Sequence, residues 1–518
     1  MKFPQQKCAR RPIKLLLTLL FTLIVTCTAE AATYYVSAGN PDGSPPYASW
    51  HTAAPDIQTA VDAATNGDII LVTNGVYHSG GRVVFGTLTN RVAISKSLTV
   101  QSVNGPSATV IQGNPILGPA AVRCVYMTSN SVLSGFTLTN GATLESGDLY
   151  QEESGGALWA TNATDAIVTN CVLAGSSASQ FGGGAYGGNI VNSVIAQNTA
   201  YDGGGLAAAA ATNSLIVSNT ASGYGGGVWS ATLKNCEVLD NTAPFGGGAE
   251  SSSLYGCLVA GNQAYQSGGG MDGGKYLVYC TVVGNSSEQG GGGINGGFSS
   301  IIGDIIYFNS VFYGSSSNYE AGGSISSCCT WPMPPSGSGN LTNDPGFVNY
   351  ASGNFQLQSN SPCINSGGYS LGYLAADLAG NPRVVDGFVD IGAYEYQSAH
   401  FILPWLFAQT YGLSLDGSID SDGDGMNNWQ EAYCGTNPTN SALLLKIISV
   451  TPSTAGAFVE WQSVPGHKYF VQHSTSLAAY PAFTTILTNI TAFQTTSSTI
   501  DPATTTNSGP YFYRVAVP

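Results

Sequence analysis

Charged residues are scarce in this 518-residue sequence. It contains 15 Lys and Arg residues and 30 Asp and Glu residues, so 9% of positions are charged, against roughly 25% in an average soluble domain. This scarcity excludes a coiled coil, a helical bundle and a chain kept disordered by charge. From Ala32 onward 10 basic residues accompany 29 acidic ones. Because binding to a phosphate backbone requires the opposite sign of charge, we expect no nucleic acid partner.

Long apolar runs are also few. The run from Leu15 to Val25 follows a basic stretch and precedes Ala29-Glu30-Ala31, which is the pattern of a cleaved secretory signal. We expect residues 1–31 to be removed, because the apolar run is shorter than the roughly 20 residues that cross a bilayer. Lipid attachment at Cys27 is the alternative. After removal of the signal we expect no transmembrane segment.

Glycine, in contrast, is abundant. The 67 glycines are close to twice the usual share of about 7%, while 43% of residues are hydrophobic and no Gly-X-Y period is present. This composition excludes collagen and low-complexity filler.

An internal repeat of 21 to 23 residues organises the middle of the chain. Glycine runs begin at Gly182, Gly203, Gly225, Gly246, Gly268 and Gly290. Asparagines recur in phase at Asn198, Asn219, Asn241, Asn262 and Asn285. Small residues recur at Cys171, Ser193, Ser214, Cys236, Cys257 and Cys280, each followed two positions later by Leu173, Ile195, Ile216, Val238, Val259 or Val282.

This repeat predicts an all-β solenoid with one rung per repeat. Residues two positions apart lie on one face of a strand, so the small residue and the aliphatic residue point inward and stack on the next rung. Glycines turn the corners, and asparagines hydrogen-bond amide to amide along the stack. Leucine-rich and calcium-binding nonapeptide repeats do not fit the spacing.

The glycine and asparagine pattern resembles the polymorphic outer membrane protein repeats and the right-handed parallel β-helix of the pectin-lyase-like superfamily. Residues 33–37, the helical pattern 57–64 and residues 67–77 are similar to the opening cap and first coils of that superfamily. Residues 343–397 resemble the choice-of-anchor Q domain of bacterial surface proteins. The resemblance implies a right-handed parallel β-helix over 32–398, with a repeat core at about 155–300.

Groups for catalysis are sparse along the coil. Residues 151–300 contain no Arg and no His, and their only Lys residues are Lys234 and Lys275. Glu250 and Asp272 both follow a glycine run by two residues, so they can stack on adjacent rungs as a catalytic pair; a solvated outer face is the alternative. A base can also come from Arg82, Arg91 and Arg123, which have no assignable partner.

Aromatic residues gather near the glycine runs. Phe181, Tyr201, Tyr224, Phe245 and Tyr265 lie one to three residues before a run, which predicts a stacked stripe along one edge. Such a stripe can protect the coil or bind glycans, with Tyr186 and Trp229 as a second exposed position. The predicted glycan-binding residues are Tyr201, Tyr224, Phe245, Tyr265, Tyr186 and Trp229.

Nine cysteines remain after removal of the signal. We expect Cys236, Cys257 and Cys280 to be buried ladder residues, while Cys328, Cys329, Cys363 and Cys434 can pair in ways that spacing does not define. No Cys and His spacing indicates zinc.

A calcium motif lies in residues 399–441. Residues 420–431 match D-x-[DN]-x-[DN]-G-x5-E, between short helical patterns. The motif predicts calcium ligands at Asp420, Asp422, Asp424, Met426 through its carbonyl, Asn428 and Glu431. It resembles thrombospondin type 3 and dockerin modules, with a single loop here. We expect the ion to stiffen the joint between two domains.

Residues 442–518 alternate apolar and polar positions between Ser-rich turns, which predicts a small β-sandwich. It resembles the fibronectin-like tails of bacterial surface proteins. Taken together, we expect a secreted or surface-exposed monomer, stabilised by calcium, that acts as an adhesin or binds polysaccharide without catalysis. The alternative is a polysaccharide lyase or glycoside hydrolase.

Overall fold

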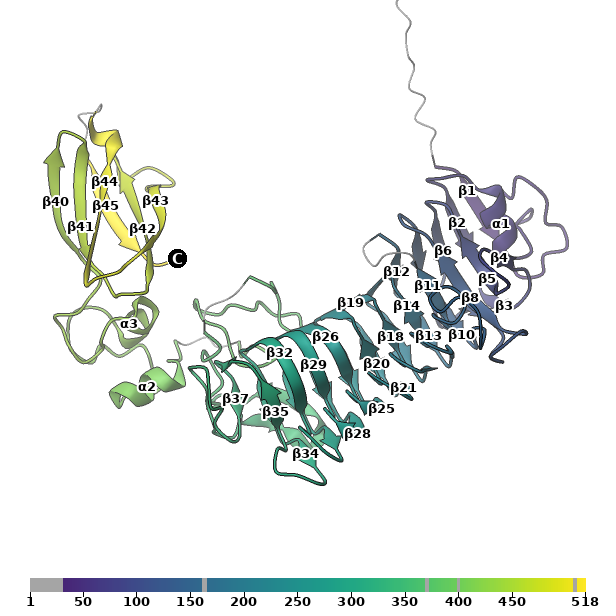
Figure 1. The fold of residues 1–518 in the computed structure, drawn as a ribbon. Coiled ribbons are helices and arrows are strands. Elements are labelled where there is room, and N and C mark those ends of the chain that lie inside the picture. Colours follow the sequence, from purple (N-terminus) through teal and green to yellow (C-terminus); the bar gives the residue numbers. More distant parts are fainter. Residues whose placement is uncertain (1–30, 161–164, 369–371, 398–400, 506–509) are drawn as a thin grey trace, which may run out of the picture.

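The computed structural model describes residues 31–160, 165–368, 372–397, 401–505 and 510–518. The predicted signal segment falls almost wholly outside these residues. From Thr33 to Thr330 the chain winds as a parallel β-helix whose strands stack rung on rung (Figure 1). The prediction of a parallel β-helix is therefore confirmed.

The largest sheet, sheet A, has 20 strands that form two neighbouring parallel stacks. The short β4 (Arg82–Val83) pairs antiparallel with the first strand of the first stack. The first stack contains β5 (Thr89–Ile94), β8 (Val122–Met127), β11 (Leu158–Ala160), β14 (Ala185–Tyr186), β18 (Leu206–Ala207), β22 (Val228–Trp229), β26 (Ala249–Tyr255), β29 (Met271–Val278), β32 (Ile294–Ile302) and β35 (Tyr319–Gly322). The second stack contains β1 (Thr33–Val36), β2 (Ile69–Val72), β6 (Thr99–Ser102), β9 (Val132–Ser134), β12 (Ile167–Thr169), β15 (Asn189–Val191), β19 (Ala210–Thr212), β23 (Thr232–Lys234), the ends of β26, β29 and β32, and β36 (Ile325–Ser326).

Two further parallel sheets belong to the coil, and the smaller one is confined to its later rungs. Sheet B has 11 strands: β3 (Gly75–Tyr77), β7 (Thr109–Gln112), β10 (Thr137–Thr139), β13 (Val172–Ala174), β16 (Val194–Ala196), β20 (Leu215–Val217), β24 (Glu237–Leu239), β27 (Leu258–Ala260), β30 (Thr281–Val283), β33 (Ile305–Tyr307) and β37 (Cys329–Thr330). Sheet C has six: β17 (Thr199–Ala200), β21 (Thr220–Ala221), β25 (Thr242–Phe245), β28 (Gln263–Ser267), β31 (Ser286–Ser287) and β34 (Ser310–Val311).

The repeat sets the register of the stacking. Ile195 pairs with Ile216, and Ile216 pairs with Val238, so equivalent aliphatic residues lie one above another. All three are fully buried in one continuous core. Each rung therefore covers the apolar surface of its neighbours, as the spacing predicts.

The glycine runs bring successive rungs into backbone contact. The amide of Gly183 donates to the carbonyl of Gly203, and the amide of Gly184 donates to the carbonyl of Gly205. A Cβ on Gly183 would lie 2.3 Å from the Thr199 carbonyl oxygen. The second and third glycines of a run are therefore required by the close approach of two backbones.

The asparagine ladder forms inside the coil, as predicted. Asn198 Nδ2 donates to Asn219 Oδ1 at 3.0 Å, and the same oxygen accepts from the backbone amide of Asn198. The pattern continues to Asn309 and Asn318, which lie beyond the regular repeat. Each amide thus satisfies backbone groups that the turn would otherwise leave buried and unpaired.

A second ladder runs through the small inward residues. Beyond Cys280 it continues with Asp304, whose carboxylate accepts from the Cys280 amide, and with Cys328, whose sulfur accepts from the Asp304 amide. Asp304 is fully buried, and this burial raises its pKa well above the usual range. The nine cysteines from Cys124 to Cys434 are buried free thiols, so the possible pairing of Cys328, Cys329, Cys363 and Cys434 is not realised.

Both ends of the coil are covered. At the start, α1 (Ile57–Ala63) is capped by Asp56, which accepts from the Thr59 amide, and α1 buries its apolar face against the first rungs. At the other end, β38 (Phe347–Asn349) and β39 (Asn354–Leu357) form a hairpin around a short 3-10 turn, η1 (Tyr350–Ser352). The chain from Ala375 to Tyr396 then folds back on the coil, where the Ala393 amide donates to Thr281 Oγ1.

This returning segment carries a buried ionic cluster. Arg383 is 1% exposed, forms an ion pair with Glu395 at 3.5 Å and lies over the ring of Tyr279 at 4.6 Å. Its Nη2 also donates to the carbonyls of Asp390 and Gly392. The cluster fixes the segment to the outside of the coil.

The remaining chain forms a helical module and two small sheets (Figure 1). The module contains α2 (Trp405–Tyr411) and α3 (Asn428–Cys434). The sheets are antiparallel, with three strands each, and share one buried core around Trp461. They contain β40 (Ile447–Ser453), β41 (Gly456–Gln462) and β44 (Thr496–Asp501) in one and β43 (Thr484–Thr491), β42 (Lys468–Ser474) and β45 (Phe512–Ala516) in the other, with η2 (Pro502–Thr505) after β44. Among the described residues, none of the helices has the length and apolar character to span a membrane.

Candidate functional site

One outer face of the coil combines aromatic rings with carboxylates. It is formed by the position just before each glycine run and by the outward position of the first stack of sheet A. We call it the acid–aromatic face, and it contains Phe181, Tyr186, Asp202, Tyr224, Trp229, Phe245, Glu250 and Asp272.

The alternation of strand residues places this face outside the core. In β22, Val228 is fully buried in the main core, whereas Trp229 is partly exposed. Successive strands align Tyr186 with Ala207, Ala207 with Trp229, and Trp229 with Glu250. A single column of outward residues therefore changes from aromatic to acidic along the coil.

The aromatic part of the face is closely stacked. The rings of Phe181 and Trp229 lie 4.9 Å apart with an interplanar angle of 8°. Phe181 also lies 6.2 Å from Tyr186. Because Ala207 occupies the position between Tyr186 and Trp229 in register, its small side chain leaves room for the Phe181 ring.

The prediction of one continuous aromatic stripe is wrong. In the position before the glycine runs, Phe181 aligns with Asp202, and Tyr224 aligns with Phe245. Tyr224 and Phe245 stack at 5.2 Å, but Asp202 separates them from Phe181. Tyr201 and Tyr265 precede their glycine runs by two and three residues, so they occupy other rung positions, where they are about half exposed. Residues that precede a glycine run by one, two or three residues occupy different positions in the rung. The strand register keeps these positions apart, so the residues do not form one stripe.

The acidic part of the face brings Glu250 and Asp272 together. They are directly opposite on β26 and β29, adjacent strands that lie about 4.8 Å apart. Asp272 accepts from Ser267 Oγ and from Asn295 Nδ2. Glu250 Oε1 accepts from Ser251 Oγ at 2.6 Å.

Glu250 is held in an environment that disfavours its charge. Burial raises its pKa, and the charges of Asp272 and Asp202 raise it further, while the Ser251 hydroxyl and Trp229 oppose the shift. Glu250 Oε2 is sealed from solvent and has no well-formed hydrogen bond among the described residues. Asp202 is 6% exposed, and burial raises its pKa although the Tyr224 amide donates to it.

Sequence reasoning missed part of the aromatic group. Tyr126 and Trp159 precede Tyr186 in the same column and stack at 4.9 Å with an angle of 6°. The ring of Tyr150, on a loop, lies 5.9 Å from that of Phe181, and the Tyr150 carbonyl accepts from Trp159 Nε1. Tyr126 lies in an irregular rung without a glycine run, and Trp159 follows only the pair Gly155-Gly156, so the three-glycine repeat did not mark either residue.

The N-terminal arginines are engaged elsewhere. Arg123 is buried and donates to the carbonyls of Gln151, Ser154 and Gly155, and burial lowers its pKa to about 9. Arg91 donates to backbone carbonyls, and Arg82 pairs with Asp62. In this structure none of the three contacts the acid–aromatic face.

The second candidate site is the carboxylate loop before α3. One oxygen each from Asp420, Asp422 and Asp424 lies within 4.8 Å of the others. Glu431, on α3, is fully buried, and burial together with the aspartates raises its pKa to about 7. Asp422 Oδ2, Asp424 Oδ2 and Glu431 Oε2 are buried and have no hydrogen-bond partner among the described residues. This convergent set of unsatisfied oxygens fits a bound cation.

The loop itself is held in shape by its own backbone. Asp420 accepts from the amides of Gly423 and Gly425, and Gly425 has a φ of 94°. The side chain of Asn428 hydrogen-bonds with Ser421 through both its oxygen and its nitrogen. Asn428 is therefore already used within the loop and fits a ligand position that acts through water.

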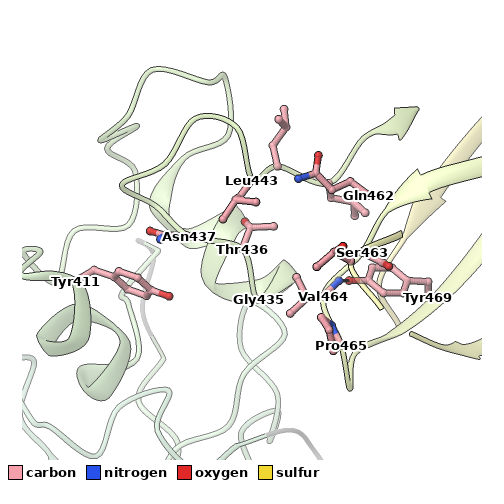
Figure 2. Close-up of a pocket in the computed structure, with 13 residues that line it drawn as sticks. Tyr411, Gly435, Thr436, Asn437, Leu443, Gln462, Ser463, Val464, Pro465 and Tyr469 are labelled. Atoms are coloured by element: carbon pink, nitrogen blue, oxygen red, sulfur yellow. Dashed lines mark hydrogen bonds between the residues drawn. The ribbon is translucent and has the colours of Figure 1, made fainter. Parts of the chain in front are cut away.

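The carboxylate loop is connected to the C-terminal sheets. Glu431 Oε1 accepts from Thr436 Oγ1 at 3.4 Å, and Tyr433 Oη donates to the Pro518 carbonyl at 2.7 Å. Thr436, Asn437 and Val464 all line one pocket at this joint (Figure 2). A cation bound by Glu431 would thus be connected to this joint through the hydrogen bond between Thr436 and Glu431.

Comparisons with known proteins concern the fold only. No family model matches the sequence, and no curated protein matches it significantly. Among solved structures, pectate lyase Pel9A has a TM-score of 0.44 at 14% identity, covering 71% of this chain and 97% of that one. A rhamnogalacturonan lyase has a TM-score of 0.31 at 10% identity, covering 62% and 92%. The mannuronan C-5 epimerase AlgE6 A-module of Azotobacter vinelandii has a TM-score of 0.29 at 14% identity, covering 60% and 100%. At these scores the similarities carry no conclusion about activity.

Proposed function

We propose that this protein is exported, acts as a monomer outside the cell or at its surface, and binds polysaccharide through the acid–aromatic face without cleaving it. The observation that carries the proposal is the stack of Phe181 on Trp229, one strand from Glu250. Stacked, partly exposed rings offer flat apolar surfaces for sugar rings. Carboxylates beside them accept hydrogen bonds from hydroxyl groups.

We further propose that calcium occupies the carboxylate loop and stabilises the joint with the C-terminal sheets. The ligands would be Asp420, Asp422, Asp424, the Met426 carbonyl, Asn428 and Glu431, since calcium prefers six to eight oxygen ligands. The buried unpaired oxygens of Asp422, Asp424 and Glu431 support this assignment. The contact of Glu431 with Thr436 supports a role for the ion at the joint.

A specific observation favours a second function, a glycoside hydrolase. Glu250 has a raised pKa and lies opposite Asp272, and hydrolases use one carboxylic acid as a proton donor beside a second, ionised carboxylate. A lyase has less support, because Arg123, Arg91 and Arg82 are engaged away from this face.

The experiment that tests the proposal incubates the purified chain with a panel of neutral, acidic and amino-bearing polysaccharides. Co-sedimentation reports binding, and new reducing ends or unsaturated products report cleavage. Binding without cleavage is the expected result. Cleavage that disappears in Glu250→Gln would replace the binding proposal with the hydrolase, and the absence of both binding and cleavage would refute the two together.

A further inference from the structure

The charge of the acid–aromatic face has one sign. Asp202, Glu250 and Asp272 lie close enough for their charges to act on one another. Between residues 151 and 300 the basic residues are Lys234 and Lys275, whose ammonium groups lie over the rings of Tyr255 and Tyr276. Neither lysine forms an ion pair with these three acids in the described part of the chain. Within the described residues these carboxylates therefore have no ion-pair partner.

This arrangement leaves Glu250 without a counter-charge. The Glu250 side chain is partly exposed and accepts a hydrogen bond from Ser251 Oγ, but the charges of the neighbouring Asp272 and Asp202 act against its ionised form. Carboxylates held this close to one another repel, and a cation bound beside them offsets that repulsion. A neutral hydroxyl would not offset the repulsion between the acids.

The neighbouring ring favours a positive charge as well. Trp229 aligns directly with Glu250 on the adjacent strand, and tryptophan is the aromatic side chain that attracts cations most strongly. A group that is positively charged and attached to a sugar ring can therefore contact Trp229 and Glu250 together. A polyuronate, in contrast, would bring further negative charge to the same place.

We infer that the acid–aromatic face binds a polysaccharide with free amino groups, such as a β-1,4-linked glucosamine polymer, in preference to neutral glycans and polyuronates. The sugar rings lie along Phe181 and Trp229, and an ammonium group lies between Trp229, Glu250 and Asp272. This inference rests on the proposed function and names its class of ligand.

Titration calorimetry with two hexasaccharides tests the inference. One is β-1,4-linked hexaglucosamine, and the other is its fully N-acetylated counterpart, which has the same backbone without the charge. We expect the wild-type chain to bind the amino form at least about tenfold more tightly at low ionic strength, with an advantage that shrinks as salt is added. Polygalacturonate should not compete.

Two variants separate the role of the acids from that of the rings. The double variant Glu250→Gln and Asp272→Asn should lower the affinity for the amino form to that of the acetylated form and leave the latter unchanged. Glu237→Gln, an exposed acid on sheet B, is the matched control and should change neither. If the double variant misfolds, the salt dependence of the wild-type preference decides the question.

The outcomes distinguish this inference from the function on which it rests. If the acetylated hexamer or polygalacturonate binds as tightly as the amino form, the inference is wrong and polysaccharide binding stands. If no saccharide binds, both the proposed function and the inference are wrong.

Discussion

Asn219 Nδ2 donates a hydrogen bond to Asn241 Oδ1 at 3.0 Å, and both side chains are completely buried. The same oxygen accepts from the backbone amide of Asn219, while Asn241 Nδ2 donates to the Ile216 carbonyl. The Asn241 side chain thus satisfies two backbone groups of the preceding rung, the Ile216 carbonyl on β20 and the Asn219 amide in the turn after β20. Stacking of apolar residues alone would leave these groups unpaired, so the ladder is as necessary to the coil as its core.

Replacing Asn241 by Ala should therefore destabilise the coil by at least about 2 kcal/mol, because each buried polar group left unpaired costs about 1–3 kcal/mol. Denaturant unfolding followed by tryptophan fluorescence measures the change. Gln263→Ala, an exposed polar residue on β28, is the control and should be nearly neutral. Equal stability of the two variants would contradict the role given to the ladder.

The glycine runs lead to a second prediction. A Cβ on Gly226 would lie 2.4 Å from the carbonyl oxygens of Gly247 and Thr242, so Gly226→Ala forces two backbones apart. We expect a loss of at least about 1–3 kcal/mol, as for other overpacked sites. A Cβ on Gly297 would meet no atom within 4 Å, and Gly297→Ala should leave the unfolding midpoint almost unchanged. A tolerated Gly226→Ala would show that the runs serve flexibility rather than close contact.

The carboxylate loop should bind calcium with one ion per chain. Asp422→Ala removes a carboxylate whose Oδ2 has no hydrogen-bond partner among the described residues. The affinity for calcium should therefore fall at least about tenfold, or about 1.4 kcal/mol. Titration calorimetry measures this loss, and Glu460→Gln, in the neighbouring sheet, is a control of equal charge change. Calcium uptake by Asp422→Ala equal to that of wild type would refute the site.

The buried ionic cluster predicts a dependence of stability on pH. Burial and the neighbouring Asp390 raise the pKa of Glu395 to about 9, with Arg383 opposing the shift, and burial raises the pKa of Asp390 to about 6. Because the folded state then binds more protons than the unfolded state, the free energy of unfolding falls as the pH rises toward these values. Between pH 6 and 9 Glu395 contributes to this loss, together with other acids whose pKa is raised, such as Glu431.

Glu395→Gln should remove the contribution of Glu395 to that loss, since a glutamine does not titrate. Thermal unfolding at several pH values from 6 to 9 compares the variant with wild type, whose midpoint should fall more steeply. Asp377, which accepts from the Glu395 amide, and Asp390, whose amide donates to Glu395, stay in place in both proteins, so the difference reports Glu395 together with its effect on Asp390. Parallel pH profiles would show that Glu395 is already ionised in the folded chain.

The coil could be predicted well from the sequence because each repeat forms the same contacts with the next repeat. The glycine, asparagine and Cys/Ser spacings each correspond to one position in the rung, so the inward stacks of Ile195 and Asn219 could be derived directly. The sequence predicted the structure less well where the repeat is interrupted. Asp304 takes a position held elsewhere by Cys or Ser, and nothing local marks it.

The outer face was the hardest part to derive. Glu250 and Asp272 were placed together because both follow a glycine run by two residues, and the register agrees. The prediction of an aromatic stripe was wrong because a difference of one residue moves a side chain to another position in the rung. Asp202, and not its neighbour Tyr201, aligns with Phe181. The stack of Phe181 on Trp229 depends on the small Ala207, which lies between Tyr186 and Trp229 in the strand register, and linear spacing does not reveal this.

The central claim is that polysaccharide lies on the ring of Trp229, and co-sedimentation of Trp229→Ala tests it most directly. Trp331→Ala is the matched control, because Trp331 is 61% exposed and lies outside the acid–aromatic face. The account predicts that Trp229→Ala loses most of its retention on the polysaccharide that binds wild type, while Trp331→Ala keeps it. Equal retention of the two variants, with both folded, would contradict the account.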